Sequence, residues 1–294
     1  MLKDPQALIV RKKKWGDYVL LALRSPRIAA EAKPGQFLMI RVSDLTSPLL
    51  RRPFSIHARE KGTVEIFFAR AGVGTEILAE KSPGETLDIL GPLGNGFRTG
   101  TKGGTPSAGR KTKGRKPGGE FKGRTVYLVG GGRGIAPLYF LALELRRGGA
   151  RPKVFYGGKT EADLPLLEKW ASCKLDLFVS TDDGSLGYCG MVSSMLEREL
   201  ERIFRRGSMS PGRATVSRPA QIFACGPDPM MEKIAALAAA YRIPAQFSLE
   251  SIMGCGIGAC WGCVKKIRRG AGAEWVKVCE DGPVFAGPEI IWQD

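Results

Sequence analysis

Four cysteines near the end of the 294-residue chain have a spacing that could hold a metal centre. Cys255, Cys260 and Cys263 follow the pattern C-x4-C-x2-C, and Cys279 comes after fifteen intervening residues. This is the spacing of plant-type ligands to a 2Fe-2S cluster. Glycines alternate through the same loop, which lets the backbone turn tightly and aim N–H groups at sulfur atoms. The sequence therefore predicts an iron–sulfur cluster held by these four residues.

Two other uses of the cysteines stay open. Structural zinc sites usually contain paired C-x2-C knuckles, and Cys279 has no second cysteine close to it in the sequence. A nucleophilic cysteine needs a base, but the only histidine, His57, lies about 200 residues away and could equally be a surface residue. The isolated thiols of Cys173 and Cys189 are predicted to be buried, because a lone cysteine behaves as a small hydrophobic residue.

Two glycine-containing segments could bind a nucleotide. In TVYLVGGGRGIAP, an apolar strand at 125–129 is followed by glycines and then by a helical pattern. This order predicts a helix N-terminus at the edge of a sheet, where unpaired N–H groups and the helix dipole favour phosphate binding. Ile135 stands where the third glycine of the G-x-G-x-x-G fingerprint belongs, and no acidic residue ends the next strand, KVFYGG. A second glycine edge, CGPDPMM at 225–231, is expected on the same side of the sheet. Together the two edges favour a nucleotide cleft over a simple strand-to-helix turn.

A third motif precedes these two. LLRRPFSI at 49–56 combines arginines, a proline, an aromatic ring and a hydroxyl at strand spacing. Some twenty residues later, FFARAGVGTEIL adds another arginine and a glycine turn before a helix, for which Thr75 is the predicted N-cap. A basic residue beside a glycine-to-helix turn suits a pyrophosphate. Taken alone, the first segment could also be an edge strand with an exposed arginine.

The elements that must position these motifs fall into three regions. Residues 6–97 consist of short alternating strands with one helix predicted at 75–81, which indicates an antiparallel barrel. The following region alternates apolar strands with helical stretches, which indicates a parallel sheet covered on both faces. The cysteine-bearing region after it is short of periodic structure. The predicted domains are 1–98 (barrel), 99–123 (basic glycine-rich linker), 124–247 (nucleotide-binding α/β domain) and 248–294 (cysteine-loop domain).

The formal charge of +16 is concentrated in two segments. Residues 99–120 carry six Lys or Arg against one acid, and residues 201–219 carry five Arg against one Glu. Both segments are rich in Gly, Pro or Ser and lack hydrophobic periodicity, which predicts solvated insertions. Neither interleaves aromatic residues for base stacking, which argues against a single-strand nucleic-acid groove.

The chain carries no sequence signal for export or for a membrane. No apolar run approaches the ~20 residues that cross a bilayer. The first fifteen residues place an apolar patch before the basic cluster, which is the wrong order for a secretory signal. Seven cysteines in such a chain are typical of metal-binding or catalytic thiols, so we expect a cytoplasmic protein.

Together, RPFS and GVGT in the barrel, VGGGRGIAP and CGPDPMM in the sheet, and the terminal cysteine loop resemble the electron transfer subunit of class B dihydroorotate dehydrogenases, within the ferredoxin reductase superfamily. The resemblance spans nearly the whole chain except the two basic segments. It implies an FAD-binding barrel, an NAD-binding parallel-sheet domain and a small 2Fe-2S domain. It implies that FAD is bound by Arg52, Pro53, Phe54, Ser55, Phe68, Ala69, Arg70, Gly74 and Thr75. It implies that NAD is received by Gly131, Gly132, Gly134, Cys225, Gly226 and Pro227, and that the cluster is held by Cys255, Cys260, Cys263 and Cys279.

The resemblance also implies an electron relay without a catalytic acid or base. Nicotinamide exchanges two electrons and a 2Fe-2S centre takes one, and a flavin can exchange either number. By resemblance, electrons come from FMN in a separate subunit that oxidises dihydroorotate, within a heterotetramer of the pyrimidine pathway. The alternatives are a subunit of an NAD(P)H-dependent ferredoxin or sulfide-type reductase and, more remotely, a zinc-stabilised nucleic-acid-binding protein.

Overall fold

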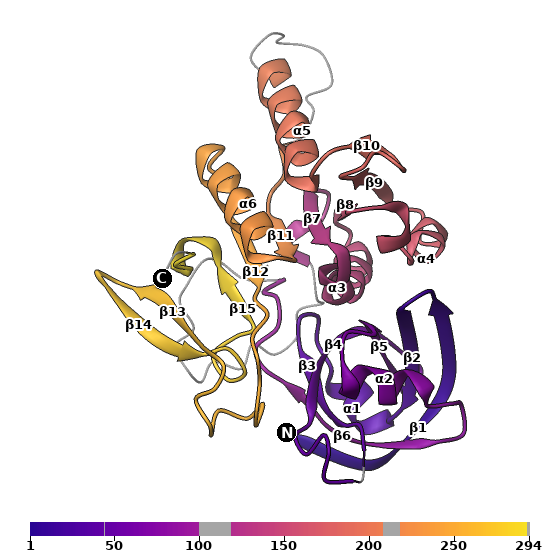
Figure 1. The fold of residues 1–294 in the computed structure, drawn as a ribbon. Helices are drawn as coiled ribbons and strands as arrows, with labels where there is room; N and C mark the ends of the chain where they lie inside the picture. Colours follow the sequence, from indigo (N-terminus) through magenta and orange to yellow (C-terminus); the bar gives the residue numbers. More distant parts are fainter. Residues whose placement is uncertain (44, 100–118, 208–217, 293–294) are drawn as a thin grey trace.

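The computed structural model describes residues 1–43, 45–99, 119–207 and 218–292. Figure 1 shows the antiparallel barrel at one end, the α/β sheet at the other and the C-terminal strands at their side. Most of the basic segment at 99–120, and residues 208–217 of the second one, lie outside the described residues.

The N-terminal part is a closed antiparallel barrel with the strand order β1-β2-β5-β4-β3-β6. Side chains on one face of each strand fill the barrel with fully buried residues such as Leu21, Leu38 and Ile66. Its elements are Leu2–Trp15 (β1), Tyr18–Arg24 (β2), Pro26–Glu31 (α1), Phe37–Arg41 (β3), Arg52–Glu60 (β4), Thr63–Ala69 (β5), Val73–Glu80 (α2) and Thr86–Leu93 (β6).

The second part is a seven-stranded sheet with the order β10-β9-β8-β7-β11-β12-β15, in which all neighbours are parallel except β12 and β15. Helices α3 and α4 pack in one buried cluster and α5 and α6 in another, so both faces of the sheet are covered. The elements are Thr125–Gly131 (β7), Ala136–Arg147 (α3), Arg151–Gly158 (β8), Leu167–Ser172 (α4), Asp176–Thr181 (β9), Tyr188–Cys189 (β10), Val192–Gly207 (α5), Ile222–Cys225 (β11), Asp228–Ala240 (α6) and Ala245–Ser248 (β12).

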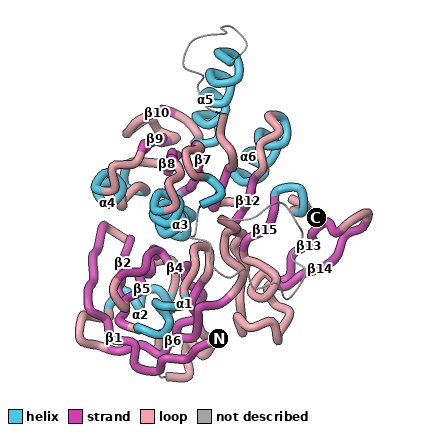
Figure 2. The backbone as a smooth tube through the Cα atoms, turned by 180° about the vertical axis from the view of Figure 1, so that it is seen from behind, coloured by secondary structure: helices cyan, strands magenta, loops and turns pink. Residues whose placement is uncertain are grey.

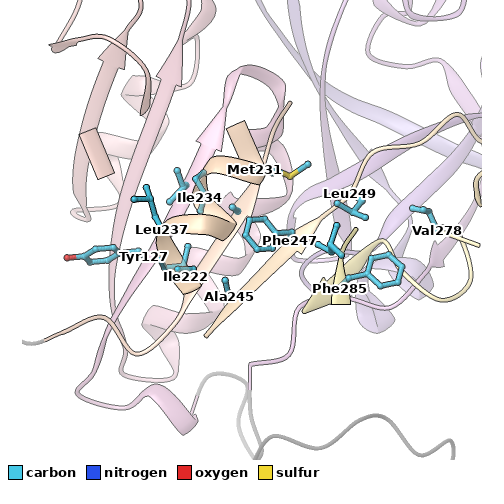
Figure 3. Packing of buried hydrophobic residues seen from close by; sticks show 14 of the residues in the cluster. Tyr127, Ile222, Met231, Ile234, Leu237, Ala245, Phe247, Leu249, Val278 and Phe285 are labelled. Carbon is cyan, nitrogen blue, oxygen red and sulfur yellow. The ribbon is translucent and has the colours of Figure 1, made fainter. Parts of the chain in front are cut away.

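The C-terminal region is joined to this sheet. It contains the hairpin Val264–Arg269 (β13) and Gly272–Lys277 (β14), and the strand Val284–Ala286 (β15) beside β12. Figure 2 shows the same arrangement from behind. Buried side chains run continuously from the sheet through Phe247 and Leu249 to Phe285 and Val278 (Figure 3). The cysteine region therefore shares a core with the α/β part.

The predicted barrel and parallel sheet are confirmed, and several local predictions are wrong. Helix α2 begins at Val73 with Gly72 as its N-cap, so Thr75 is not the capping residue. The barrel contains a second helix, α1. Residues 201–207 continue α5 and bury Ile203, so this part of the second basic segment is helical. The C-terminal region has more regular structure than its sequence indicates, because β15 is stabilised by pairing with a distant strand.

The structure also tests the predictions made for three isolated side chains. Cys173 is buried as predicted, whereas Cys189 is exposed on the edge strand β10. His57 is fully buried between the barrel and α3, so the surface location considered for it is wrong.

Within the described ranges, no helix is long and apolar enough to span a membrane. The four domain ranges given above stay a prediction.

Candidate functional site

A cavity of about 270 Å³ lies between the barrel and the sheet. Strands β4 and β5 and the start of α2 supply one wall, and the ends of β11 and β12 supply the other. Of the residues predicted to bind cofactor, its lining contains Pro53, Phe54, Ser55, Phe68, Ala69, Thr75 and Cys225. Sequence reasoning did not single out Phe37, Phe67, Ala71, Ser248, Leu249 and Glu250, which also line it. The two motifs of the barrel thus meet at one cavity.

Three residues of the predicted flavin set lie beside this cavity without lining it. The Nη1 of Arg52 donates a hydrogen bond to the carbonyl oxygen of Leu50 at 2.8 Å, and its side chain packs against Gly74 at the start of α2. Arg70 pairs with Glu80 at 3.6 Å. Arg52 and Gly74 therefore form one contact, in which a Cβ on the glycine would be 3.2 Å from the arginine Nε.

Thr75 has a definite structural role in the turn before α2. Its hydroxyl accepts a hydrogen bond from the N–H of Ala71 and donates one to the carbonyl oxygen of Gly72, each at 2.8 Å. These bonds fix the turn that brings Ala71 and Thr75 to the cavity wall. Free N–H groups of the first helical turn can hold an anionic oxygen there.

A larger cavity of about 610 Å³ lies at the carboxyl edge of the parallel sheet. It is lined by the predicted residues Gly131, Gly132, Gly134, Gly226 and Pro227. Lys159 also lines it; the sequence leaves open whether this lysine after KVFYGG is a surface residue or a contact to a 2′-phosphate. The cavity is also lined by residues that the sequence analysis missed: Tyr18, Asp163, Asp182, Met230 and Lys233. The rule that ligands bind beyond the carboxyl ends of parallel strands could have identified Asp182, because it follows β9 directly.

The two cavities adjoin. Arg133 and Glu250 line both of them, so a ligand in one can reach a ligand in the other. Cys225 stands at this junction with 2% of its surface exposed. Burial raises the pKa of the Cys225 thiol, so the side chain is neutral and carries its proton. The junction therefore contains a neutral sulfur, the guanidinium of Arg133 and the carboxyl of Glu250, whose pKa is raised by burial.

The four spaced cysteines come from two segments, the loop before β13 and the turn after β14, and fall into two pairs. The backbone N–H of Cys260 donates to the Sγ of Cys255 at 3.4 Å, and that of Cys279 donates to the Sγ of Cys263 at 3.4 Å. Gly258 donates to the Sγ of Cys279 at 3.1 Å with a φ of 82°, a backbone conformation that favours glycine. Among the described residues, no group of three or more His, Cys, Asp or Glu side chains is arranged around a single metal position.

The electrostatics of the loop differ between its two pairs. Burial acts to raise the pKa of Cys255, but N–H groups that include those of Ile257 and Cys260 outweigh it and lower that pKa to about 6. Burial and the neighbouring Cys263 raise the pKa of Cys279 to about 12. Four thiols with N–H donors aimed at three of them match the donor set of a cluster with two irons and two cysteines for each.

Exposed apolar side chains surround the cysteine loop. Ile252 is 89% exposed and Trp261, between the second and third cysteines, is 57% exposed. Trp261 has a φ of 55°, which is rare for a bulky residue, and the ammonium of Lys277 lies 4.9 Å from its ring centre. A surface of this kind next to a redox site fits contact with another protein.

Several known proteins are similar to this chain in sequence. Residues 250–291 match the iron-sulfur cluster binding domain of dihydroorotate dehydrogenase B. The chain is 34% identical to the electron transfer subunit of dihydroorotate dehydrogenase B (NAD(+)) from Desulforamulus reducens, over 92% of this chain and 90% of that protein. The subunit of the same name from Bacillus caldolyticus is 38% identical, over 91% of this chain and 90% of that protein.

Solved structures give the same picture. The NADH-dependent reduced ferredoxin-NADP oxidoreductase is 28% identical with a TM-score of 0.75, over 98% of this chain and 91% of that one. A ferredoxin NADP+ reductase from Neisseria gonorrhoeae, with bound FAD and NADP, shares the fold with a TM-score of 0.57 and 15% identity, over 81% of this chain and 91% of that one. From its identity to relatives over nearly its whole length, the chain belongs to the family of dihydroorotate dehydrogenase B (NAD(+)) electron transfer subunits.

Proposed function

We propose that this chain is the electron transfer subunit that links dihydroorotate oxidation to NAD+ reduction in pyrimidine (UMP) biosynthesis. The observation that carries the proposal is the continuity of three sites. The sheet-edge cavity and the barrel cavity adjoin at Arg133 and Glu250, and the barrel cavity is also lined by Met253, two residues before the first cysteine of the loop. A chain that brings three redox sites into contact is suited to a relay.

The residues fit three groups of different chemistry. FAD is assigned to the barrel cavity, with Arg52, Pro53, Phe54, Ser55, Phe68, Ala69, Arg70, Gly74 and Thr75 as its proposed residues. NAD is assigned to the sheet edge, with Gly131, Gly132, Gly134, Gly226 and Pro227, and with Cys225, which lines the adjoining barrel cavity. A 2Fe-2S cluster is assigned to Cys255, Cys260, Cys263 and Cys279. When bound, a flavin exchanges two electrons with nicotinamide and single electrons with the cluster.

The protein's own contribution is positioning and electrostatics. The apolar rings of Phe54, Phe67 and Phe68 line the barrel cavity and exclude water from a planar ligand. The cysteine loop is anchored to the barrel, because Gly256 lies against Met39 of β3 so closely that a Cβ there would overlap its side chain. These contacts hold the loop beside the barrel cavity, and N–H donors to sulfur tune the potential of a bound cluster.

The partner is proposed to be the FMN-containing catalytic subunit, in a heterotetramer. The exposed apolar surface of Ile252, Ile257 and Trp261 around the cysteine loop supports contact at this face, because electrons must enter close to the cluster. We also infer a cytoplasmic location, because metal binding by cysteines, here proposed for four of the seven, is typical of proteins in that compartment.

A second candidate function uses the same cofactors with a different partner. The 28% identity to the NADH-dependent reduced ferredoxin-NADP oxidoreductase over 98% of the chain favours a subunit of a ferredoxin-linked reductase. The identities of 34% and 38% to dihydroorotate dehydrogenase B subunits favour the first candidate.

Anaerobic purification together with candidate partner subunits tests the proposal. We expect a complex with an FMN-containing dihydroorotate dehydrogenase, with FAD, iron and acid-labile sulfide in the electron transfer chain, and with dihydroorotate-dependent NAD+ reduction. Stoichiometric zinc without sulfide would contradict the relay. Copurification with a ferredoxin-linked partner, and no activity with dihydroorotate, would select the second candidate.

A further inference from the structure

The only histidine of the chain lies at the contact between the barrel and the α/β part. His57 belongs to β4 and is fully buried. Its Nδ1 is 2.9 Å from the carbonyl oxygen of Ala136. Its ring stacks on Tyr139 of α3, with ring centres 4.7 Å apart and an angle of 18° between the planes. Figure 1 shows α3 on the side of the sheet that faces β4 and β5.

The hydrogen bond of His57 joins the two parts of the molecule that carry the nucleotide motifs. On one side, His57 follows the 53–55 segment of β4, which lines the barrel cavity, by two residues. On the other side, Ala136 is the first residue of α3, two residues after the glycine loop at 131–134, and it also lines the barrel cavity. One bond therefore links the segment proposed for FAD to the loop proposed for NAD.

The chemistry of the contact fixes the state of the ring. A carbonyl oxygen only accepts, so Nδ1 must carry a proton, and in a neutral ring Nε2 then holds a lone pair. No hydrogen-bond partner lies near Nε2 within the described part of the chain. Burial, reinforced by the positive charge of Lys169, lowers the pKa of His57 to about 3, so the ring is neutral at physiological pH.

Other links also join the two parts. Lys169 of α4 bonds to Glu65 of β5, and its ammonium lies 4.5 Å from the centre of the Tyr139 ring. The hydroxyl of Tyr18 donates to Asp163 at 3.0 Å, and both residues line the larger cavity. None of these links bonds to Ala136, where the glycine loop leads into α3.

We propose that His57 is a positioning residue that holds the glycine loop and the start of α3 at a fixed distance from the 53–55 segment of β4, and so sets the approach of nicotinamide to flavin. The inference rests on the proposed function. Hydride transfer needs its two reacting atoms about 3–3.5 Å apart, and a misplacement of about 1 Å can slow such a step by about 10²-fold. The buried hydrogen bond of His57 lies next to both sites and limits how far the glycine loop can move from β4.

Two variants separate the hydrogen bond from the ring stack. His57→Phe keeps an aromatic ring against Tyr139 and removes the donor, whereas His57→Asn keeps an N–H donor near the Nδ1 position and removes the ring. The readout is the anaerobic reduction of bound FAD by NADH in a rapid-mixing experiment. For His57→Phe we expect a limiting rate at least about tenfold lower, with flavin content unchanged and half-saturating NADH within about twofold. His57→Asn is expected to recover most of the rate.

A second readout does not depend on cofactor or activity. Because the chain has one histidine, the imidazole ¹⁵N signals of the labelled protein need no assignment. We expect the neutral Nδ1-protonated tautomer near pH 7, and this measurement keeps the proposal testable if the Phe variant fails to fold.

Three results would overturn the proposal: an Nε2-protonated or cationic ring, a normal rate in the Phe variant, or equal losses in both variants. A wild-type protein whose FAD is not reduced by NADH would instead contradict the proposed function, and the tautomer measurement would still stand.

Discussion

Gly134 of the glycine loop and Cys225 at the end of β11 are in direct backbone contact. A Cβ on Gly134 would overlap the carbonyl oxygen of Cys225 and stand 2.6 Å from the Cα of Gly226. The two glycine-bearing edges, which are about ninety residues apart in the sequence, therefore form one continuous wall of the larger cavity. Only a residue without a side chain allows this approach.

Replacing Gly134 by Ala is expected to push these two edges apart. Because the obstacle is backbone, the clash cannot be relieved by a rotamer change, and we expect a loss of about 1–3 kcal/mol in unfolding free energy with at least tenfold weaker NADH binding. Thermal unfolding and NADH titration check this. Gly272→Ala in the β13–β14 hairpin, where a Cβ has room, is the control. Equal behaviour of the two variants would show that the close approach is not required.

Replacing Cys260 by Ser is expected to remove the iron–sulfur absorbance and the coupling to the partner. The hydroxyl is a poorer ligand than a thiolate for iron. Reduction of FAD by NADH should remain close to normal, because Cys260 does not line either cavity. Metal and sulfide analysis with stopped-flow flavin reduction measures both effects. Cys189→Ser, an exposed cysteine outside the loop, should leave iron and sulfide unchanged. A full iron complement in the Cys260 variant would remove this residue from the ligand set.

Replacing Arg52 by Ala is expected to weaken FAD binding about tenfold or more. The guanidinium packs on the first turn of α2, where it can pair with a pyrophosphate, and a charge-assisted contact of this kind contributes about 1.5–3 kcal/mol. Flavin content after dialysis is the measurement. The exposed Arg24 at the end of β2 supplies the control variant, Arg24→Ala. Retention of flavin by the Arg52 variant would argue against the assigned role.

Replacing Trp261 by Ala is expected to weaken association with the catalytic subunit by about 2 kcal/mol, roughly thirtyfold in Kd, if its indole is buried in the interface. Trp275, 54% exposed on the β13–β14 hairpin, offers a tryptophan of nearly equal exposure as the matched control. Binding of each variant to the purified partner is measured with cluster content verified. Normal binding by the Trp261 variant would place the interface elsewhere.

The buried histidine makes stability depend on pH. The pKa of His57 is lowered from about 6.5 in the unfolded chain to about 3 in the fold, so below pH 6.5 the unfolded state binds the extra proton and is favoured. Lys169 and Glu65 are the charged groups that act on the ring. Between pH 7.5 and 5.5 the wild type should lose about 1.4 kcal/mol that His57→Phe does not lose. Thermal unfolding of both proteins across this pH range checks the direction of the change in stability. An equal pH dependence of stability in the two proteins would contradict a neutral buried imidazole.

The barrel, the sheet and the cysteine loop were predictable because each depends on local patterns. Alternating apolar residues indicate a half-buried strand, and a continuous apolar run followed by glycine indicates a parallel strand before a helix. Helix starts were less accurate. The cap of α2 is Gly72 and not Thr75, because the threonine hydroxyl is used to close the preceding turn. The charge-rich end of α5 was not predicted as a helix. Its helical pattern depends on the spacing of a few buried residues such as Ile203, and the prediction considered mainly the number of arginines.

The sequence by itself determined the fold class, the family and the four candidate ligands of the cluster, because hydrophobic patterns and cysteine spacing are properties of the chain alone. Only the tertiary structure decided which residues share a cavity. Asp182 and Lys233 meet the glycine loop at a sheet edge formed by strands far apart in the chain, and Arg133 and Glu250 line both cavities. His57 is the clearest case, because its environment comes from β5, α3 and α4, whose approach depends on packing between the barrel and the sheet.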